Sequence, residues 1–115
     1  MDAFEKLEVW KRSARLSVEL YKQLSGCRDA GFKDQITRAA LSVPSNIAEG
    51  YERDSGREFA RFLRIAKGSC GELQTQLYIG AEAGFMDKPV ALDMVAEATE
   101  IARMLQGLIA RCVAD

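Results

Sequence analysis

The chain has 115 residues, of which 48% are hydrophobic and 29% are charged, and its formal net charge is −1. This balance is typical of one soluble globular domain and excludes a uniformly basic nucleic-acid binder. No apolar run approaches the roughly 20 residues that cross a bilayer, and the charged N-terminus does not resemble a signal peptide. We therefore expect a single domain over residues 1–115, in the cytoplasm and with no membrane partner.

The residue types that are missing narrow the chemistry. The chain contains no histidine, and its three cysteines, Cys27, Cys70 and Cys112, include no Cys-x-x-Cys pair. Imidazole acid–base chemistry, Ser-His and Cys-His nucleophiles and imidazole zinc sites are therefore excluded. There is no glycine-rich phosphate loop either. We expect no enzyme activity, cofactor or metal, and we interpret Cys70 and Cys112 as buried thiols.

Hydrophobic periodicity predicts four helices and no strand. The first helix is expected from about Leu7 to Leu24, with Gly26 suited to a left-handed position behind it. Two apolar stripes partly overlap along this helix. The first consists of Leu7, Trp10, Ala14, Val18, Tyr21 and Leu24, and the second of Val9, Leu16 and Leu20. A helix that is apolar on two sides needs more than one neighbour.

The second helix is predicted over Phe32–Tyr51. Asp29 is a candidate N-cap, and Gly50 is a candidate C-terminal cap. The apolar stripe of this helix consists of Ile36, Ala40, Val43 and Ile47.

Pro44 lies inside this pattern. It has no N–H to donate, and its ring crowds the carbonyl of Ala40, which costs roughly 3 kcal/mol in an exposed helix. The unbroken apolar spacing favours one continuous helix, kinked near Pro44, with Ser42, Ser45 or water bonding the freed carbonyl. The alternative is a fresh helix that begins at Pro44.

A capping box at Ser55 and Glu58 starts the third helix, which is predicted to end at about Gly84. Its stripe alternates four- and three-residue steps and consists of Phe59, Leu63, Ala66, Cys70, Leu73, Leu77 and Gly80. This spacing is typical of helices that pack at a shallow angle. The helix also contains Gly68, Gly71, Gly80 and Gly84. Each glycine costs about 1 kcal/mol relative to alanine, so we expect another helix to approach closely there. The alternative is that Gly80 and Gly84 only mark a fraying end.

The fourth helix is predicted to begin at Asp87, with Pro89 in its first turn. One stripe consists of Val95, Ala98, Ala102, Leu105, Ile109 and Cys112, and a second of Met94, Ile101 and Leu108. Four helices joined by short loops predict an all-α, up-down-up-down antiparallel bundle. The second stripes of the first and fourth helices are expected to face other copies of the chain in a homo-oligomer.

A polar pair is expected between the second and third helices. If these two helices form an antiparallel hairpin, Arg38 lies opposite the region from Ser69 to Glu72. We predict a partly buried Arg38–Glu72 ion pair that fixes the helix register. The alternative is a small polar site built from Gln35, Arg38, Ser69 and Glu72.

Basic residues gather on one helix although the chain as a whole is slightly acidic. The first half of the third helix carries a row of Arg53, Arg57, Arg61, Arg64 and Lys67, and the first helix adds Lys11, Arg12 and Arg15. Such a row can follow the phosphates of a nucleic acid, and an oligomer would multiply it. The alternative is a solvated face that neighbouring acids neutralise.

Three segments resemble a known family. Phe4–Lys11, Gln35–Gly50 and Phe62–Leu77 are similar to the four-helix-bundle proteins encoded in intervening sequences of bacterial 23S ribosomal RNA genes. The most specific motif contains Pro44, Ser45, Asn46, Glu49 and Gly50.

The resemblance implies a four-helix bundle that assembles as a ring, typically a pentamer, and it brings no catalytic residues. The chain also resembles the accessory variability determinant of diversity-generating retroelements, a similar pentameric bundle that binds nucleic acid through a basic surface. We therefore expect a non-enzymatic ring with an RNA-related role. The alternatives are a scaffold that binds a protein partner, and a small-molecule site where Ser45, Asn46 and Glu49 converge.

Overall fold

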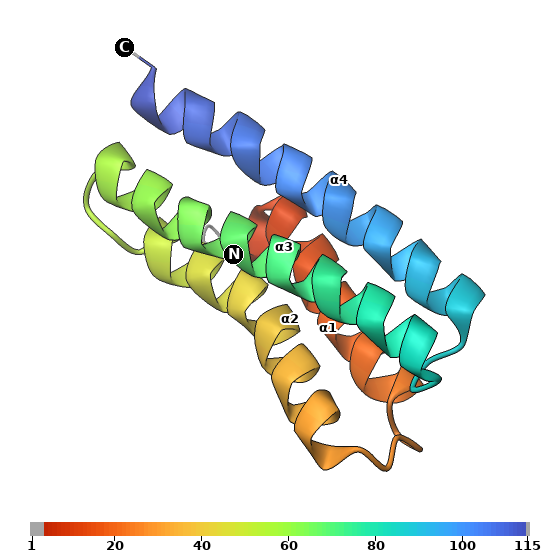
Figure 1. The fold of residues 1–115 in the computed structure, drawn as a ribbon. Helices are drawn as coiled ribbons and strands as arrows, with labels where there is room; N and C mark the ends of the chain where they lie inside the picture. Colours follow the sequence, from red (N-terminus) through yellow and green to blue (C-terminus); the bar gives the residue numbers. More distant parts are fainter. Residues whose placement is uncertain (1–3, 115) are drawn as a thin grey trace.

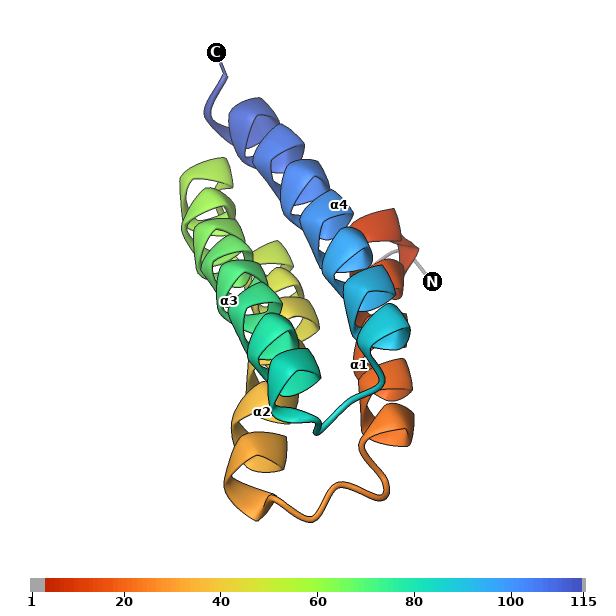
Figure 2. The same ribbon diagram turned by 45° about the vertical axis from the view of Figure 1, so that its right-hand side comes forward.

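The computed structural model describes residues 4–114, which fold into an all-α four-helix bundle (Figure 1). After a short 3₁₀ helix at Phe4–Lys6, α1 covers Glu8–Gln23, α2 Ala30–Tyr51, α3 Gly56–Ala83 and α4 Lys88–Val113. Consecutive helices run in opposite directions, as both views of the ribbon show (Figures 1 and 2). The predicted up-down-up-down antiparallel fold is therefore confirmed.

Local capping explains where the helices begin. The side chains of Asp29, Ser55 and Asp87 each accept a hydrogen bond from the backbone N–H three residues later, at 2.8, 3.1 and 3.4 Å. Each bond satisfies one of the donors that the first turn of a helix leaves free. Behind α3, Gly84 has a φ of 82°, a left-handed conformation that glycine adopts without strain. The helix starts at these three caps were predicted and are confirmed.

Each helix packs mainly on its neighbours in the chain. The contact of α3 with α4 is the most extensive, followed by that of α2 with α3, and the seam between α1 and α4 is the lightest. α1 and α3 lie diagonally opposite, and within residues 4–114 their backbones do not approach each other closely. Leu63, Leu73 and Leu77 of α3 are fully buried at the centre. Cys70 is buried as predicted, and burial raises the pKa of its thiol to about 12.

The predicted assignment of the apolar stripes is wrong for α1 and α4. The second stripe of α1, with Val9, Leu16 and Leu20, is buried in the core of its own chain. In α4 the second stripe is likewise covered within the chain, with Met94 and Ile101 buried. In α4 one bundle uses both stripes, because this helix has two neighbours. In α1 the core uses the second stripe, and Val18 and Tyr21 of the first stripe stay exposed.

α2 runs without a break through Pro44. The predicted continuous helix is therefore confirmed, and a new helix does not begin at Pro44. The kink stays a prediction. The carbonyl freed by the proline is that of Ala40, four residues earlier. The buried hydroxyl of Ser17 on α1 donates to this Ala40 oxygen at 3.0 Å, and the same Oγ lies 3.1 Å from Ser13 O. The predicted partners Ser42 and Ser45 were wrong, because the donor comes from the neighbouring helix.

Gly50 is the last residue but one of α2, and Glu52 takes the C-cap position that was predicted for it. A Cβ built on Gly50 would lie 2.6 Å from Phe62 Cβ and 3.3 Å from the Phe59 carbonyl oxygen, so α3 passes too close for any side chain. The predicted close approach is confirmed at Gly80 in α3. A Cβ built there would lie 2.5 Å from Cζ of the Phe32 ring on α2. At Gly68 and Gly71 the prediction is wrong, because a Cβ on either would meet nothing within 4 Å.

Candidate nucleic-acid interface

Phe62 in α3 organises part of the predicted basic row. Its ring is buried, and Cζ of Arg53 and Arg61 lie 4.8 and 4.5 Å from the ring centroid. Arg53 also donates to Glu49 at 2.6 Å, and Arg61 donates to both oxygens of Glu58 at 3.2 and 3.3 Å. The Arg61 hydrogen bond lowers the pKa of Glu58. An aromatic ring and a carboxylate therefore hold and compensate each of these two arginines.

The other three residues of the row, Arg57, Arg64 and Lys67, have a different environment. All three are exposed, and among the ion pairs of residues 4–114 none joins them to a carboxylate. Lys67 instead donates to the neutral amide oxygen of Gln106 on α4, at 2.7 Å. The row is thus divided into an ion-paired couple around Phe62 and three cations that form no ion pair, which we call the uncompensated cations. Glu58 also attracts Arg57, at longer range. This division depends on side-chain contacts that the spacing in the sequence does not reveal.

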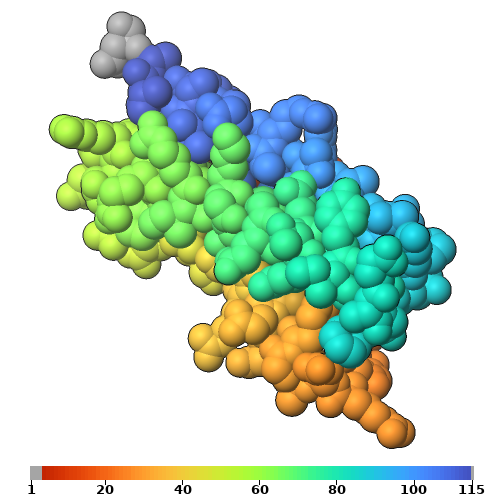
Figure 3. Space-filling view, viewed as in Figure 1, coloured from red at the N-terminus to blue at the C-terminus, as the bar shows by residue number. Residues whose placement is uncertain are grey.

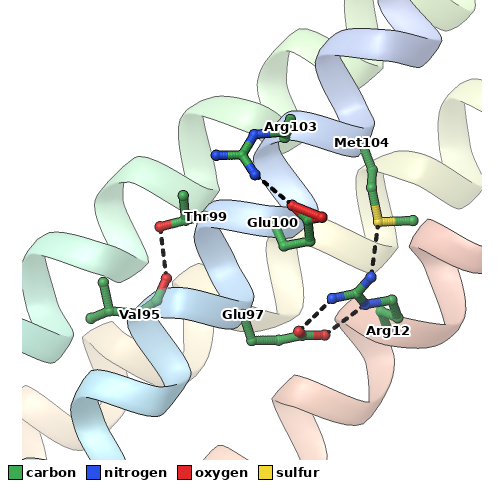
Figure 4. Close-up of polar contacts among 7 residues, drawn as sticks. All are labelled: Arg12, Val95, Glu97, Thr99, Glu100, Arg103 and Met104. Atoms are coloured by element: carbon green, nitrogen blue, oxygen red, sulfur yellow. Dashed lines mark hydrogen bonds and ion pairs between the residues drawn. The ribbon is translucent and has the colours of Figure 1, made fainter.

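Arg12 on α1, predicted as part of the basic surface, forms a structural contact with α4. Its Nη2 and Nε donate to the two carboxylate oxygens of Glu97 on α4, at 2.6 and 2.9 Å, and Nη1 lies 3.5 Å from Met104 Sδ (Figure 4). This bidentate pair spans the lightest seam of the bundle. Lys11 and Arg15 stay exposed on α1, but α1 is diagonal to α3, so one chain does not bring them to the α3 row.

The Arg12–Glu97 pair predicts an acid-sensitive stability. The hydrogen bond from Arg12 lowers the pKa of Glu97 below its ordinary value of 4.5. The folded state therefore binds fewer protons than the unfolded chain, so this stabilisation is present above pH 4.5 and disappears as the pH falls through the folded pKa. We expect Glu97→Gln to lower the free energy of unfolding by roughly 0.2–1 kcal/mol at neutral pH, because both side chains are partly exposed.

Urea unfolding of the wild type and Glu97→Gln between about pH 3 and pH 7 measures this effect. The difference between the two proteins should shrink towards the acid end. Glu100→Gln is the control, because Glu100 forms its ion pair with Arg103 on its own helix and no hydrogen bond with Arg12 within residues 4–114 (Figure 4). A Glu97→Gln difference that stays constant with pH would contradict the assignment.

The predicted partly buried Arg38–Glu72 pair is wrong. The Arg38 side chain is 76% exposed and pairs with Asp34 on its own helix at 3.5 Å, and Glu72 is exposed on α3. The polar contact between α2 and α3 is a hydrogen bond of 2.8 Å between the hydroxyls of Ser42 and Ser69. The Ser42–Ser69 contact lies within about one residue of the register that placed Arg38 opposite Glu72. The error is therefore in the direction of the two side chains, which are both exposed.

The family-motif residues do not converge on a polar site. Asn46 donates to the Ser42 carbonyl at 2.8 Å, Glu49 accepts from Arg53, and Ser45 is exposed. The hollow beside this motif is instead an apolar groove of about 440 Å³ between α1 and α2. We call it the α1–α2 groove. Its lining includes Trp10, Ala14, Ser17, Val18, Tyr21, Leu41, Pro44, Ser45 and Ala48.

The polar features of the described residues favour an anion over a metal ion or a membrane. In residues 4–114 no three His, Cys, Asp or Glu side chains gather as metal ligands would. None of the helices in that range combines the length and the apolar character that a membrane span requires. The uncompensated cations of α3 are therefore the feature on which a functional interpretation rests.

The family model described as 23S rRNA-intervening sequence protein matches residues 5–107. This segment includes the basic row on α3 and the motif around Pro44. A search of curated proteins found no match to the chain.

Proposed function

The chain belongs to the family of 23S rRNA-intervening sequence proteins, and from this premise we propose that it is a non-enzymatic, ring-forming helical bundle that binds RNA. The observation that carries the proposal is the set of uncompensated cations on α3. Arg57, Arg64 and Lys67 are exposed, and their charges are free to act on phosphate oxygens. Arg57 also lies in the first turn of α3, where the helix dipole disfavours a cation, so helix stability does not account for it.

The α1–α2 groove supports the proposed ring. Val18, Tyr21 and Leu41 are 51%, 44% and 42% exposed along it, and a contiguous apolar surface of this kind favours association. A second copy of the chain that covers the groove, repeated around an axis, gives a closed ring. In a pentamer, the three uncompensated cations would occur five times on one particle, and weak phosphate contacts would act together.

The test is a titration of short single-stranded RNA and of an RNA hairpin against the protein, read by fluorescence anisotropy between about 50 and about 200 mM salt. We expect affinity to fall with salt at a logarithmic slope of about −0.7 for each single-strand phosphate contact. Arg57→Glu should weaken binding by about tenfold or more, because it replaces attraction by repulsion. Light scattering on the same samples should give the mass of the ring.

Arg28→Glu is the matched control, because Arg28 is an exposed arginine in the loop at the other end of the bundle. It makes the same change in net charge and should leave the affinity nearly unchanged. Equal losses in the two variants, or no binding of the wild type at low salt, would contradict the RNA-binding function.

A protein-binding scaffold is the second candidate function, and the α1–α2 groove is the observation that favours it. An apolar groove with few polar groups at its wall suits an apolar protein segment better than a phosphate chain. Two results together favour this candidate. Neither the single-stranded RNA nor the hairpin binds at low salt, and light scattering gives the mass of a monomer. The groove would then be uncovered and available to another protein.

A further inference from the structure

A second groove lies between the first half of α3 and the last turns of α4. Its volume is about 720 Å³, and α3 contributes Arg64, Lys67 and Gly68 to it, while α4 contributes Gln106 and Val113. We call it the α3–α4 groove. The face of the molecule on which α3 and α4 meet is turned to the viewer in Figure 3.

The polar lining of the α3–α4 groove consists of hydrogen-bond donors. Arg64 and Lys67 are two of the three uncompensated cations, and no carboxylate lines the groove. Lys67 spans towards α4 by its 2.7 Å hydrogen bond to Gln106 Oε1. This bond uses one ammonium hydrogen and leaves two, and it leaves the Gln106 NH₂ group free to donate. The groove is therefore complementary to a negatively charged group.

Gly68 leaves the backbone of α3 bare at the floor of this groove. A Cβ at this position would meet no atom within 4 Å, so packing inside the chain does not require a glycine there. A helix-interior glycine without a packing role permits close approach of another molecule to the backbone. Its position between two uncompensated cations and the groove points to a ligand that touches this part of α3.

We propose that the α3–α4 groove holds the phosphates of a single-stranded RNA backbone, with Arg64 and Lys67 as the contacting residues and Gly68 as the point of close approach. This inference rests on the proposed RNA binding and adds which part of the basic row makes the contact. Arg53 and Arg61 are not contacts, because Phe62 and their carboxylates hold them. The groove has no aromatic wall on which bases could stack, so recognition is independent of sequence.

The experiment compares two double variants of the full chain that lose the same charge from the same row. Arg64→Ala with Lys67→Ala should weaken binding of a short single-stranded RNA by about tenfold or more. The salt slope should become shallower by about 1.4, for two lost single-strand contacts. Arg53→Ala with Arg61→Ala should change the affinity by less than about threefold and leave the slope nearly unchanged.

A second pair of variants tests the groove without changing charge. Gly68→Leu places a side chain in the α3–α4 groove and should weaken RNA binding. Gly71→Leu is the matched control, because Gly71 is equally open and exposed on the same helix but does not line the groove. Circular dichroism melts of all four variants confirm that each is folded at the temperature of the titration.

The outcomes separate this inference from the proposed function. Equal weakening in the two double variants would overturn the groove assignment, because it would indicate a general charge effect. Displacement of the RNA by polyglutamate at equal charge, or by inorganic phosphate at equal phosphate concentration, would overturn it in favour of an acidic-peptide or free-anion site. A wild type that binds no RNA would overturn the proposed function itself. If the wild type binds RNA and the Arg64→Ala, Lys67→Ala double variant binds it equally well, only this inference is overturned.

Discussion

Replacing Gly50 by alanine is expected to lower the free energy of unfolding by about 2 kcal/mol. Alanine has the better helix propensity, worth up to about 1 kcal/mol, so an isolated helix would gain stability. In the bundle, the new Cβ would lie 2.6 Å from Phe62 Cβ and 3.0 Å from Phe59 Cδ1. Phe62 Cβ is fixed to the α3 backbone, so the clash is relieved only if the two helices move apart, at a cost of about 1–3 kcal/mol or more.

Thermal and urea unfolding measure this loss, and the melting temperature should fall by roughly 10 °C for a domain of this size. Gly71→Ala is the control, because it makes the same substitution where a Cβ meets nothing within 4 Å. It should raise the stability by up to about 1 kcal/mol. If Gly50→Ala also raised the stability, α3 would not approach α2 as closely as described.

Ser17→Ala should lower the free energy of unfolding by about 1–3 kcal/mol, because it leaves a buried carbonyl without a hydrogen-bond donor. Pro44 has no N–H, and the Ser17 hydroxyl 3.0 Å away is the donor that reaches the Ala40 oxygen from α1. Ser13→Ala is the matched control, because Ser13 is a buried serine on the same helix whose hydroxyl donates to Trp10 in that helix. Ser13→Ala should lower the free energy of unfolding by less than Ser17→Ala does.

A double-mutant cycle with Pro44→Ala tests the reason for this cost. Alanine at position 44 supplies an N–H that can donate to the Ala40 carbonyl, so Ser17→Ala should then cost less than in the wild type. We expect a coupling energy of about 1 kcal/mol in urea unfolding. Additive effects of the two substitutions would mean that Ser17 stabilises the bundle for a reason unrelated to the proline.

Local signals in the sequence predicted the four helices and their starts. The caps at Asp29, Ser55 and Asp87 act over three residues, and apolar periodicity acts over one turn, so both can be recognised without knowing any neighbour. The motif around Pro44 and the segment Phe62–Leu77 likewise indicated the family. The bundle and the family were therefore accessible from the chain alone.

Contacts between helices were decided only by the tertiary structure. The sequence predicted an Arg38–Glu72 ion pair and a C-cap role for Gly50, and both predictions were wrong. It also gave no sign that Arg12 bonds Glu97 on α4. The stripe of α1 with Val18 and Tyr21 looked as suitable for the core as the stripe with Leu16 and Leu20.

The uncompensated members of the basic row were also hidden in the sequence. Arg61 and Arg64 are both row residues at helical spacing, yet Arg61 lies over Phe62 and bonds Glu58, whereas Arg64 lines a groove. The physical reason is geometric. An error of one residue in the register of an α-helix turns each side chain by about 100°, which moves it from a neighbouring helix to solvent, and no local signal fixes that rotation. The sequence thus determined which helices form, and only the packing of the four together decided which charges stay free for a ligand.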